Sequence, residues 1–273
     1  MTLALPGFWG TPTSTVDWCE VNYAVTPFIC EFFNTVSSLA MVVAGALGVL
    51  LHRGVLDRWT RSAFGLLCLV GVGSIAFHGT LKFELQMLDE LPMLYLVTLM
   101  AYLLAEPGPT PRFGVWLPVV LVGYALLATL SAAVMRGRLQ FFAFQTSFGL
   151  LELFCLVRVY WLSRDPGNAP VRRLFQLGMA CYGAAILLWF VDLRLCDVIN
   201  VRLTAFGLPN PQLHAWWHVL VSCGFYMLLL VVGYDRIRHT RRWPVARRLG
   251  GIIPCLVLAE RLPKATTTTV VNV

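Results

Sequence analysis

Three histidines of this chain lie inside or at the ends of long apolar segments, where an ionisable side chain is costly and usually has a function. They are His78, His214 and His218. The last two are four residues apart, so a helix would place both imidazoles on one face, which is the spacing of a two-histidine metal site. Three histidines with one open position are the ligand set of a catalytic zinc site. We therefore expect a zinc ion at these three residues.

Further polar residues lie close to the three histidines in the expected arrangement of the apolar segments. Ser74 precedes His78 by four residues and shares its helix face, and Asp89 opens the next apolar segment. A single histidine in a bundle can also donate to a backbone carbonyl, and for His78 alone this alternative has equal weight. The hydroxyl and the carboxyl beside the three imidazoles favour the metal site. Asp192, at the end of another segment, is expected to be a structural acceptor or to orient a ligand imidazole.

An acidic segment precedes the first apolar run. Asp17, Glu20, Asn22 and Glu31 offer oxygen ligands of the kind that calcium prefers, and the backbone carbonyl of Trp18 could complete the set. The segment is not an EF-hand, because it lacks that motif's spacing and its central glycine. A solvated acidic loop is the competing interpretation, and the residues alone favour it.

The elements that must position these residues are membrane spans. The chain has 273 residues, of which 58% are hydrophobic and 13% charged, and its mean hydropathy is +0.72, which is typical of a multi-pass membrane protein. We predict an all-α fold with seven transmembrane helices. The predicted spans are 33–51, 63–77, 88–104, 116–134, 141–162, 174–191 and 212–232.

The positions of the basic residues predict the orientation, because Lys and Arg are retained on the cytosolic side. One set of alternate connections carries 16 of the 21 Lys and Arg residues, and the other set carries five. We expect a lumenal or extracellular N-terminal segment with the calcium candidate (1–32), a seven-span catalytic domain (33–232) and a cytosolic C-terminal tail (233–273). The net charge of +7 therefore reflects membrane orientation, and no nucleic-acid-binding module is visible.

The remaining cysteines and histidines are expected to have other roles. The eight cysteines form no CxxC pair, which argues against thiolate metal binding. Cys19 and Cys196 both fall on the predicted lumenal side, where a disulfide is chemically possible, but the sequence leaves their proximity open. His52 and His239 flank spans on the cytosolic side and are expected to be solvated there. Beyond Trp243 we expect a loosely ordered cytosolic tail.

Six strings of residues resemble the alkaline ceramidases, and within them the alkaline ceramidase 3, or phytoceramidase, branch. They are Phe8-Trp9-Gly10, Ser14-Thr15-Val16-Asp17-Trp18-Cys19-Glu20, Glu31-Phe32-Phe33-Asn34-Thr35-Val36-Ser37, Phe77-His78-Gly79-Thr80-Leu81, Gln86-Met87-Leu88-Asp89-Glu90-Leu91-Pro92 and Leu213-His214-Ala215-Trp216-Trp217-His218. Members of this family are seven-span zinc amidases of endoplasmic reticulum or Golgi membranes. They cleave ceramide, dihydroceramide or phytoceramide into a sphingoid base and a free fatty acid.

The resemblance implies that zinc is held by His78, His214 and His218. With zinc there, we expect Asp89 to accept a proton from the attacking water and to deliver it to the leaving amine. Ser74 is expected to stabilise the oxyanion by hydrogen bonding.

The resemblance also reverses the interpretation of the acidic segment. It implies a calcium ion whose ligands are Asp17, Trp18, Glu20, Asn22 and Glu31. A disulfide between Cys19 and Cys196 would also agree with the resemblance to this family. The chain departs from the family pattern at Val21, Ser38 and Gly79, and none of these departures removes a proposed ligand.

Two functions of other classes remain as alternatives. The related progesterone and adiponectin receptor family has a seven-span zinc architecture, so the chain could be a lipid-sensing receptor with slow hydrolysis. A metal transporter could also carry intramembrane histidines and aspartates, but it would need a polar path through both leaflets. The expected cytosolic halves of the spans offer few residues for such a path.

Overall fold

The computed structural model describes residues 7–203, 205–240 and 242–259, and within them it is mostly helical. The elements are α1 (Phe32–Ser37), α2 (Leu39–Leu51), α3 (Arg58–Thr80), α4 (Phe83–Ala105), α5 (Trp116–Val134), α6 (Gly137–Arg164), η1 (Pro166–Val171), α7 (Arg172–Val198), η2 (Ile199–Leu203), α8 (Leu213–His239), β1 (Pro244–Leu249) and β2 (Ile253–Leu258). Seven helical segments are long and apolar enough to cross a membrane, which agrees with the predicted seven-span bundle.

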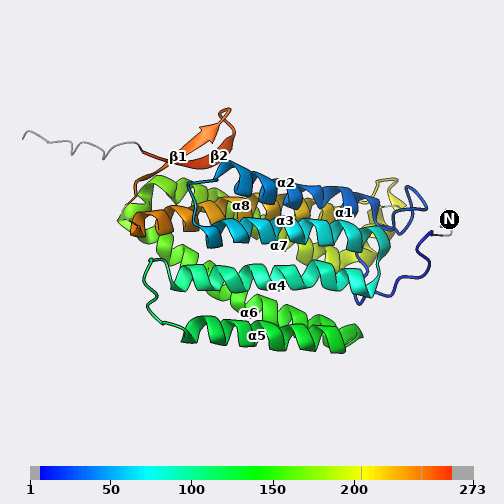
Figure 1. Cartoon of the computed structure of the whole chain (residues 1–273). Coiled ribbons are helices and arrows are strands. Elements are labelled where there is room, and N and C mark those ends of the chain that lie inside the picture. The colour runs from blue at the N-terminus through cyan, green and yellow to red at the C-terminus, as the bar shows by residue number, and fades with distance from the viewer. Residues whose placement is uncertain (1–6, 204, 241, 260–273) are drawn as a thin grey trace, which may run out of the picture.

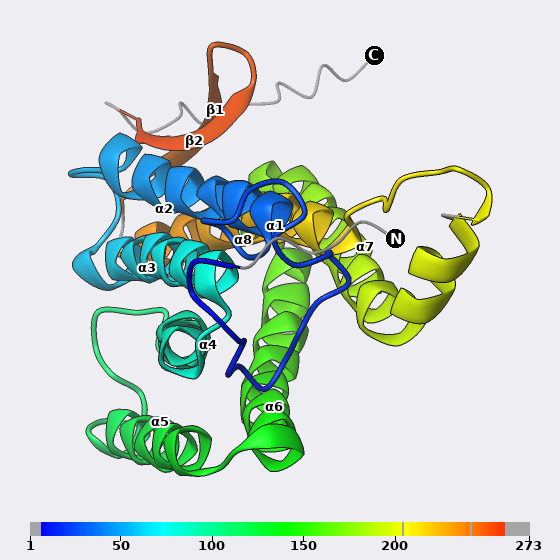
Figure 2. The same cartoon turned by 90° about the vertical axis from the view of Figure 1, so that its right-hand side faces the viewer.

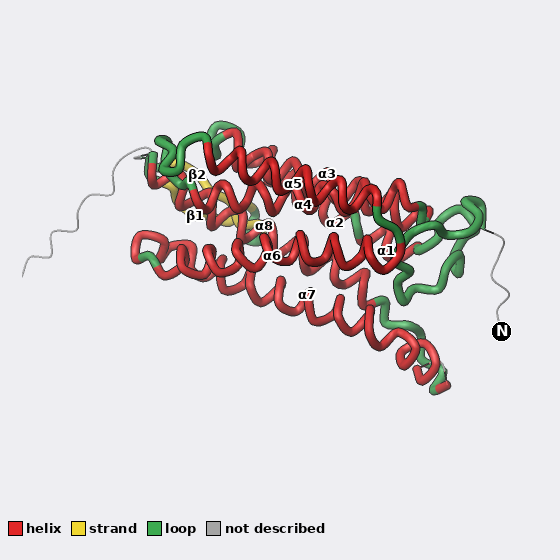
Figure 3. Tube along the Cα trace, turned by 90° about the horizontal axis from the view of Figure 1, so that it is seen from below, coloured by secondary structure: helices red, strands yellow, loops and turns green. Residues whose placement is uncertain are grey.

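The long helices lie side by side along one direction, with α5 at the outer edge (Figure 1). Seen from the end, α6 runs obliquely from α5 towards α8 (Figure 2). The far end of α7 diverges from the bundle (Figure 3). The N-terminal segment, α1 and the start of α8 lie at the same end of the molecule. This end therefore collects the segments in which the candidate site residues were found.

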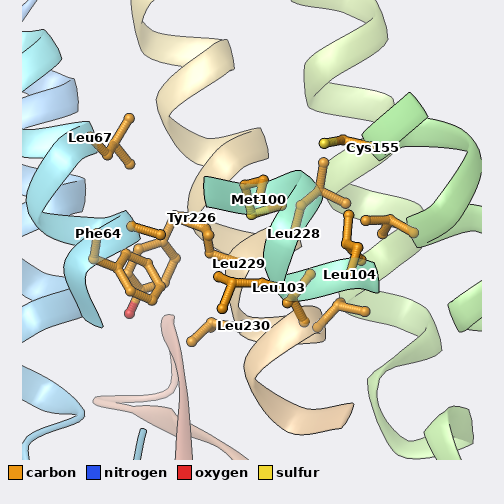
Figure 4. Close-up of a cluster of buried hydrophobic side chains, with 14 of the residues drawn as sticks. Phe64, Leu67, Met100, Leu103, Leu104, Cys155, Tyr226, Leu228, Leu229 and Leu230 are labelled. Atoms are coloured by element: carbon orange, nitrogen blue, oxygen red, sulfur yellow. The ribbon is translucent and has the colours of Figure 1, made fainter. Parts of the chain in front are cut away.

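The apolar core occupies the opposite half of the bundle. Phe64 and Leu67 from α3, Met100 and Leu103 from α4, and Leu229 from α8 belong to one buried cluster (Figure 4). Each of these side chains is at most 3% exposed. Apolar contacts dominate this cluster, whereas buried polar groups elsewhere in the bundle need their own hydrogen-bond partners.

Helices α3 and α4 approach closely at Gly73. A Cβ atom built at this position would lie 2.1 Å from the carbonyl oxygen of Leu88. Only glycine fits such an approach, and it brings the helix turn that carries Ser74 against the turn that carries Asp89. By contrast, Gly65 on the same helix has no neighbour within 4 Å of an added Cβ.

Most helices extend beyond the predicted spans, and the first and sixth spans also differ in their course. The first is two helices, α1 and α2, which meet at Ser38, whose hydroxyl donates to the carbonyl oxygen of Asn34 at 2.7 Å. The sixth was predicted to end at 191, but α7 runs on to Val198 and continues as a π-helix to Leu203. Asp192 interrupts the apolar pattern there, and the helix tolerates it because the carboxylate accepts the backbone N–H of Cys19 at 3.1 Å.

The expectation of a loosely ordered tail is wrong for residues 244–258, which form an antiparallel hairpin. Gly250 and Gly251 make its turn with φ values of 58° and 77°. Leu256 is 0% exposed, and the hydroxyl of Tyr226 on α8 donates to the carbonyl oxygen of Pro254 at 2.9 Å. The hairpin is therefore docked on the bundle. The threonine run at 266–269 lies outside the described residues.

The same hairpin corrects the expectation for His52. This side chain is not solvated but 0% exposed. Its Nδ1 lies 2.9 Å from the carbonyl oxygen of Gly48, and its Nε2 accepts the backbone N–H of Leu256 at 3.1 Å. Burial lowers the pKa of His52, which keeps the imidazole neutral and able to accept. His52 is a structural residue that anchors β2.

Replacing Gly73 by alanine tests the close approach of α3 and α4. The added methyl group must push the helices apart, so we expect Gly73→Ala to lose about 1–3 kcal/mol of stability. Gly65→Ala is the matched control on the same helix, and it should leave stability unchanged or raise it by up to about 1 kcal/mol. Thermal unfolding in detergent measures the difference. Equal stability of the two variants would contradict the close packing.

Candidate metal centre

The three predicted histidines converge at one end of the bundle. His78 lies in the last turn of α3, and His214 and His218 lie in the first turns of α8. One ligand atom from each imidazole lies within 4.8 Å of the other two. The side chains are 1%, 3% and 2% exposed in chain order. Such a group of buried nitrogen donors can hold a divalent metal ion such as zinc.

The outward ring nitrogens of two histidines have fixed partners. Nδ1 of His78 lies 2.5 Å from Oε2 of Glu31, and Nδ1 of His218 lies 2.8 Å from Oγ of Ser37. These contacts leave Nε2 of both rings for the centre of the cluster, which is the usual way in which outer partners orient ligand histidines.

The third histidine supplies a further test of the site. Nδ1 of His214 is buried and has no hydrogen-bond partner among the described residues. The ring stacks on Trp18 with the two ring centroids 3.7 Å apart. A buried nitrogen without a partner is costly, and a metal ion would satisfy it. The donor set therefore fits a zinc ion.

Ser74 and Asp89 lie beside the histidines, as predicted. Both line one cavity together with His214 and His218. The hydroxyl of Ser74 accepts a hydrogen bond from Ser38 at 3.0 Å and is also a hydrogen-bond partner of the Asp89 carboxyl. The cavity thus presents a hydroxyl and a carboxyl next to the candidate metal ligands.

The rest of this cavity is mainly apolar, and its walls come from α3, α4, α6, α7 and α8. The apolar lining residues include Leu67, Val70, Met93, Phe148, Tyr182 and Phe225. Glu90 and Gln145 also line the cavity, so several polar groups share a space whose walls are mostly hydrocarbon. This arrangement suits a substrate with a polar reacting group and long apolar chains.

The acidic N-terminal segment is partly buried against this end of the bundle. Burial raises the pKa of Glu20 to about 7, although backbone N–H groups of Phe33 and Asn34 oppose the shift. Burial likewise raises the pKa of Glu31 to about 8 and raises that of Asp17. No Lys or Arg pairs with these three carboxyls within the part of the chain that the structure describes.

Hydrogen bonds connect several of the five candidate calcium ligands. Their carboxylates do not form a group as compact as that of the three imidazoles. Both oxygens of Glu20 accept backbone N–H groups at the start of α1, at 2.7 and 2.9 Å. The side-chain amide of Asn22 donates to Asp17 at 3.2 Å, while its oxygen is buried without a partner among the described residues. Glu31 turns towards His78, and its other carboxyl oxygen accepts the N–H of Trp18 at 3.1 Å.

A disulfide fastens this segment to α7. The bond joins Cys19 and Cys196, whose Cα atoms are 5.2 Å apart. Asp192 accepts the adjacent backbone N–H of Cys19 and also that of His214, so its carboxyl links the N-terminal segment to the start of α8. The six remaining cysteines are free.

Sequence reasoning missed the residues that orient the ligands. Ser37 was noticed only as part of a motif, and Glu31 was assigned to calcium alone. A signal was available, since both are polar residues at the start of an apolar span, where an unpaired polar group is costly. Which histidine each would meet depends on tertiary contacts across 47 and 181 positions of sequence.

Comparison with known proteins agrees with this site. The ceramidase family profile matches residues 10–248. Alkaline ceramidase 3 of Mus musculus is 34% identical over 92% of this chain and 94% of its own length. An alkaline ceramidase of Arabidopsis thaliana is 28% identical over 93% and 96%, and alkaline ceramidase 1 of Homo sapiens is 26% identical over 88% and 92%. The chain therefore belongs to the alkaline ceramidase family and is a ceramidase-type hydrolase of the membrane.

Proposed function

We propose that this enzyme uses zinc, held by His78, His214 and His218, to hydrolyse the amide bond of ceramide, dihydroceramide or phytoceramide. The products are a sphingoid base and a free fatty acid. The observation that carries the proposal is the convergence of three buried imidazoles on a mainly apolar cavity that also contains Ser74 and Asp89.

The residues around the cavity supply the proton transfers. When bound, zinc acts as a Lewis acid that polarises a carbonyl and lowers the pKa of water to roughly 7. Asp89 accepts a proton from the water that attacks the amide carbon and later delivers it to the amine nitrogen as the C–N bond breaks. Ser74 donates a hydrogen bond to the oxyanion that forms on the carbonyl oxygen. Glu31 and Ser37 hold the imidazoles of His78 and His218 in place.

Replacing one ligand tests this function directly. We expect His218→Ala to lower the release of sphingoid base from all three ceramide types by roughly a hundredfold or more, because a two-histidine site holds zinc poorly. Bound zinc should fall in parallel, as measured by elemental analysis of the purified protein.

His239→Ala is the matched control, since His239 lies at the opposite end of the same helix with a side chain that is 43% exposed. It should keep both zinc and turnover. A His218→Ala enzyme that remains folded and still hydrolyses ceramide would contradict the zinc mechanism.

We also propose that the N-terminal segment binds calcium through Asp17, Trp18, Glu20, Asn22 and Glu31. Support comes from carboxyls with raised pKa values and no basic partner, and from the unpartnered oxygen of Asn22. A cation would offset the cost of burying these acids together. Because Glu31 also contacts His78, the calcium site would order the entrance to the metal centre.

Removing calcium should therefore lower activity while zinc stays bound. A calcium-selective chelator is expected to reduce turnover, and added calcium but not magnesium should restore it. Asn22→Ala should raise the calcium concentration needed for half-maximal activity, whereas Glu84→Gln, an exposed acid at the same end of the bundle, should not. Unchanged turnover with calcium demonstrably absent would refute the calcium role.

The orientation proposed for the bundle places the N-terminal segment and both metal sites on the lumenal side of an endoplasmic reticulum or Golgi membrane, and the C-terminal tail in the cytosol. The excess of Lys and Arg in the cytosolic connections supports it, and the Cys19–Cys196 disulfide suits an oxidising compartment.

Epitope accessibility tests this orientation. After selective permeabilisation of the plasma membrane, an antibody should reach a C-terminal tag, whereas an N-terminal tag should need full permeabilisation. The opposite pattern would reverse the proposed topology.

A further inference from the structure

The C-terminal hairpin carries exposed apolar and basic side chains side by side. Leu249 and Ile252, which flank its turn, are 51% and 83% exposed. Arg247 and Arg248 precede them and are exposed as well. Neither arginine has an acidic partner within the part of the chain that the structure describes, and residues 242–259 contain no Asp or Glu. The proposed catalytic and calcium sites use none of these side chains.

The hairpin lies at the level where the first span ends. The backbone N–H of Leu256 donates to His52, the residue that follows α2. In both views the hairpin lies on the outer side of α2 with its turn directed away from the helices (Figure 1, Figure 2). Its two strands form the whole sheet in the described chain, so β1 has a free backbone edge. The free edge is unfavourable in hydrocarbon and the exposed apolar turn is unfavourable in water, so the hairpin fits the boundary between lipid headgroups and chains.

An apolar groove runs along the bundle beside the hairpin. Its volume is about 490 Å³, and its walls come from α2, from α8 and from the hairpin residues Ile253 and Pro254. Leu39, Val43 and Leu47 line it on α2 and, at a spacing of four residues, lie on one face of the helix. These three residues span about 12 Å along the helix axis. An apolar groove of this shape on the outside of a membrane span suits the hydrocarbon chain of a lipid.

The strand pairing places a positive charge beside this groove. Arg248 is the partner of Pro254 in the antiparallel register, and Arg247 is its neighbour in the strand. Directly paired residues of antiparallel strands lie on the same face of a sheet, so Arg248 shares the face of Pro254, which lines the groove. An apolar groove with arginines beside it is complementary to a lipid that has acyl chains and an anionic phosphate group.

We propose that the hairpin and this groove bind an anionic phospholipid from the membrane leaflet at the C-terminal end of the bundle. One acyl chain lies in the groove between α2 and α8, and Arg247 and Arg248 contact the headgroup phosphate. The proposed orientation makes this the cytosolic leaflet, whose anionic lipids attract basic segments next to a span. A zwitterionic lipid offers the same chains and phosphate, but its positive group offsets the attraction of the arginines. A headgroup with a net negative charge is therefore preferred.

A chain bound in the groove contacts the two helices that hold His218 in place. The groove includes Leu39, the residue after Ser38, and Ser222, whose hydroxyl donates to the carbonyl oxygen of His218 at 2.5 Å. A lipid that binds only the folded protein stabilises it, so we expect the phospholipid to raise the unfolding temperature. This measurement needs no turnover of ceramide, so the lipid site and the proposed hydrolysis can fail separately.

Competition between two lipids tests the arginines. Native mass spectrometry of the full-length protein follows lipid retention in detergent that contains equal amounts of phosphatidylserine and phosphatidylcholine with identical acyl chains. We expect the wild-type protein to retain phosphatidylserine preferentially, with each arginine contributing about fivefold. Replacing both by glutamine (Arg247→Gln, Arg248→Gln) should remove most of this preference. Replacing both by lysine (Arg247→Lys, Arg248→Lys) should keep it, because the charge remains. Arg138→Gln, at an exposed position at the opposite end of the bundle, is the matched control and should also keep it.

Filling the groove tests the position of the acyl chain. Val43 lines the groove and is 54% exposed, so Val43→Trp places an indole there without entering the protein core. Retention of phosphatidylserine, and the rise in unfolding temperature that it causes, should both fall. Val120→Trp on α5 is the matched control, since Val120 is 63% exposed and does not line the groove. Glycerophosphoserine, which has the headgroup without acyl chains, should not displace the phospholipid.

Unfolding temperatures in phosphatidylcholine alone show whether each variant is folded, and Val43→Phe carries the groove test if Val43→Trp does not fold. Unchanged retention and stabilisation in the folded groove variant would overturn the groove as the place of the acyl chain. Equal retention of the two lipids by the wild-type protein, or an unchanged preference after both arginines become glutamine, would overturn the anionic lipid site.

Discussion

The carboxyl of Glu31 joins three parts of the chain that are distant in sequence. It contacts the imidazole of His78 on α3, the backbone N–H of Trp18 in the N-terminal segment and the side-chain amide of Asn34 on α1. The backbone N–H of Glu31 also donates to the carbonyl oxygen of His78 at 2.9 Å. Glu31 is 0% exposed, so each of these groups would be left unpaired in a dry environment without it. The orientation of the His78 imidazole and the placement of Trp18 and Asn34 beside it therefore depend on this one residue.

The break between α1 and α2 also helps to orient a histidine of the candidate metal centre. Because the two helices meet at Ser38, the hydroxyls of Ser37 and Ser38 both come near Nδ1 of His218, at 2.8 and 3.4 Å. The opposite half of the bundle contains a large cluster of buried apolar side chains, together with buried polar contacts such as that between Asn168 and Asp235. The end of the bundle that holds the three histidines therefore depends on a network of polar contacts between segments that are distant in sequence.

The sequence predicted the features that depend on local composition. Apolar runs gave the spans, and the cost of burying His78, His214 and His218 identified them as a site, which the structure brings together. The sequence could not reveal contacts that depend on packing between distant segments. Ser37 meets His218 across 181 positions, and His52 is buried only because β2 folds back onto it. Each strand has only six residues, and β1 contains two arginines, so the sequence pattern was too weak to predict a hairpin.

The disulfide constrains the order in which synthesis and cross-linking of this protein can occur. It spans 177 positions, from the N-terminal segment to the end of α7, so the ribosome must synthesise six of the seven membrane segments before the cross-link can form. Until then the acidic segment lacks its covalent attachment to α7. His214 and His218 follow still later, in the last helix. An unfinished chain therefore lacks two of the three histidines of the candidate metal centre until its last helix has been synthesised.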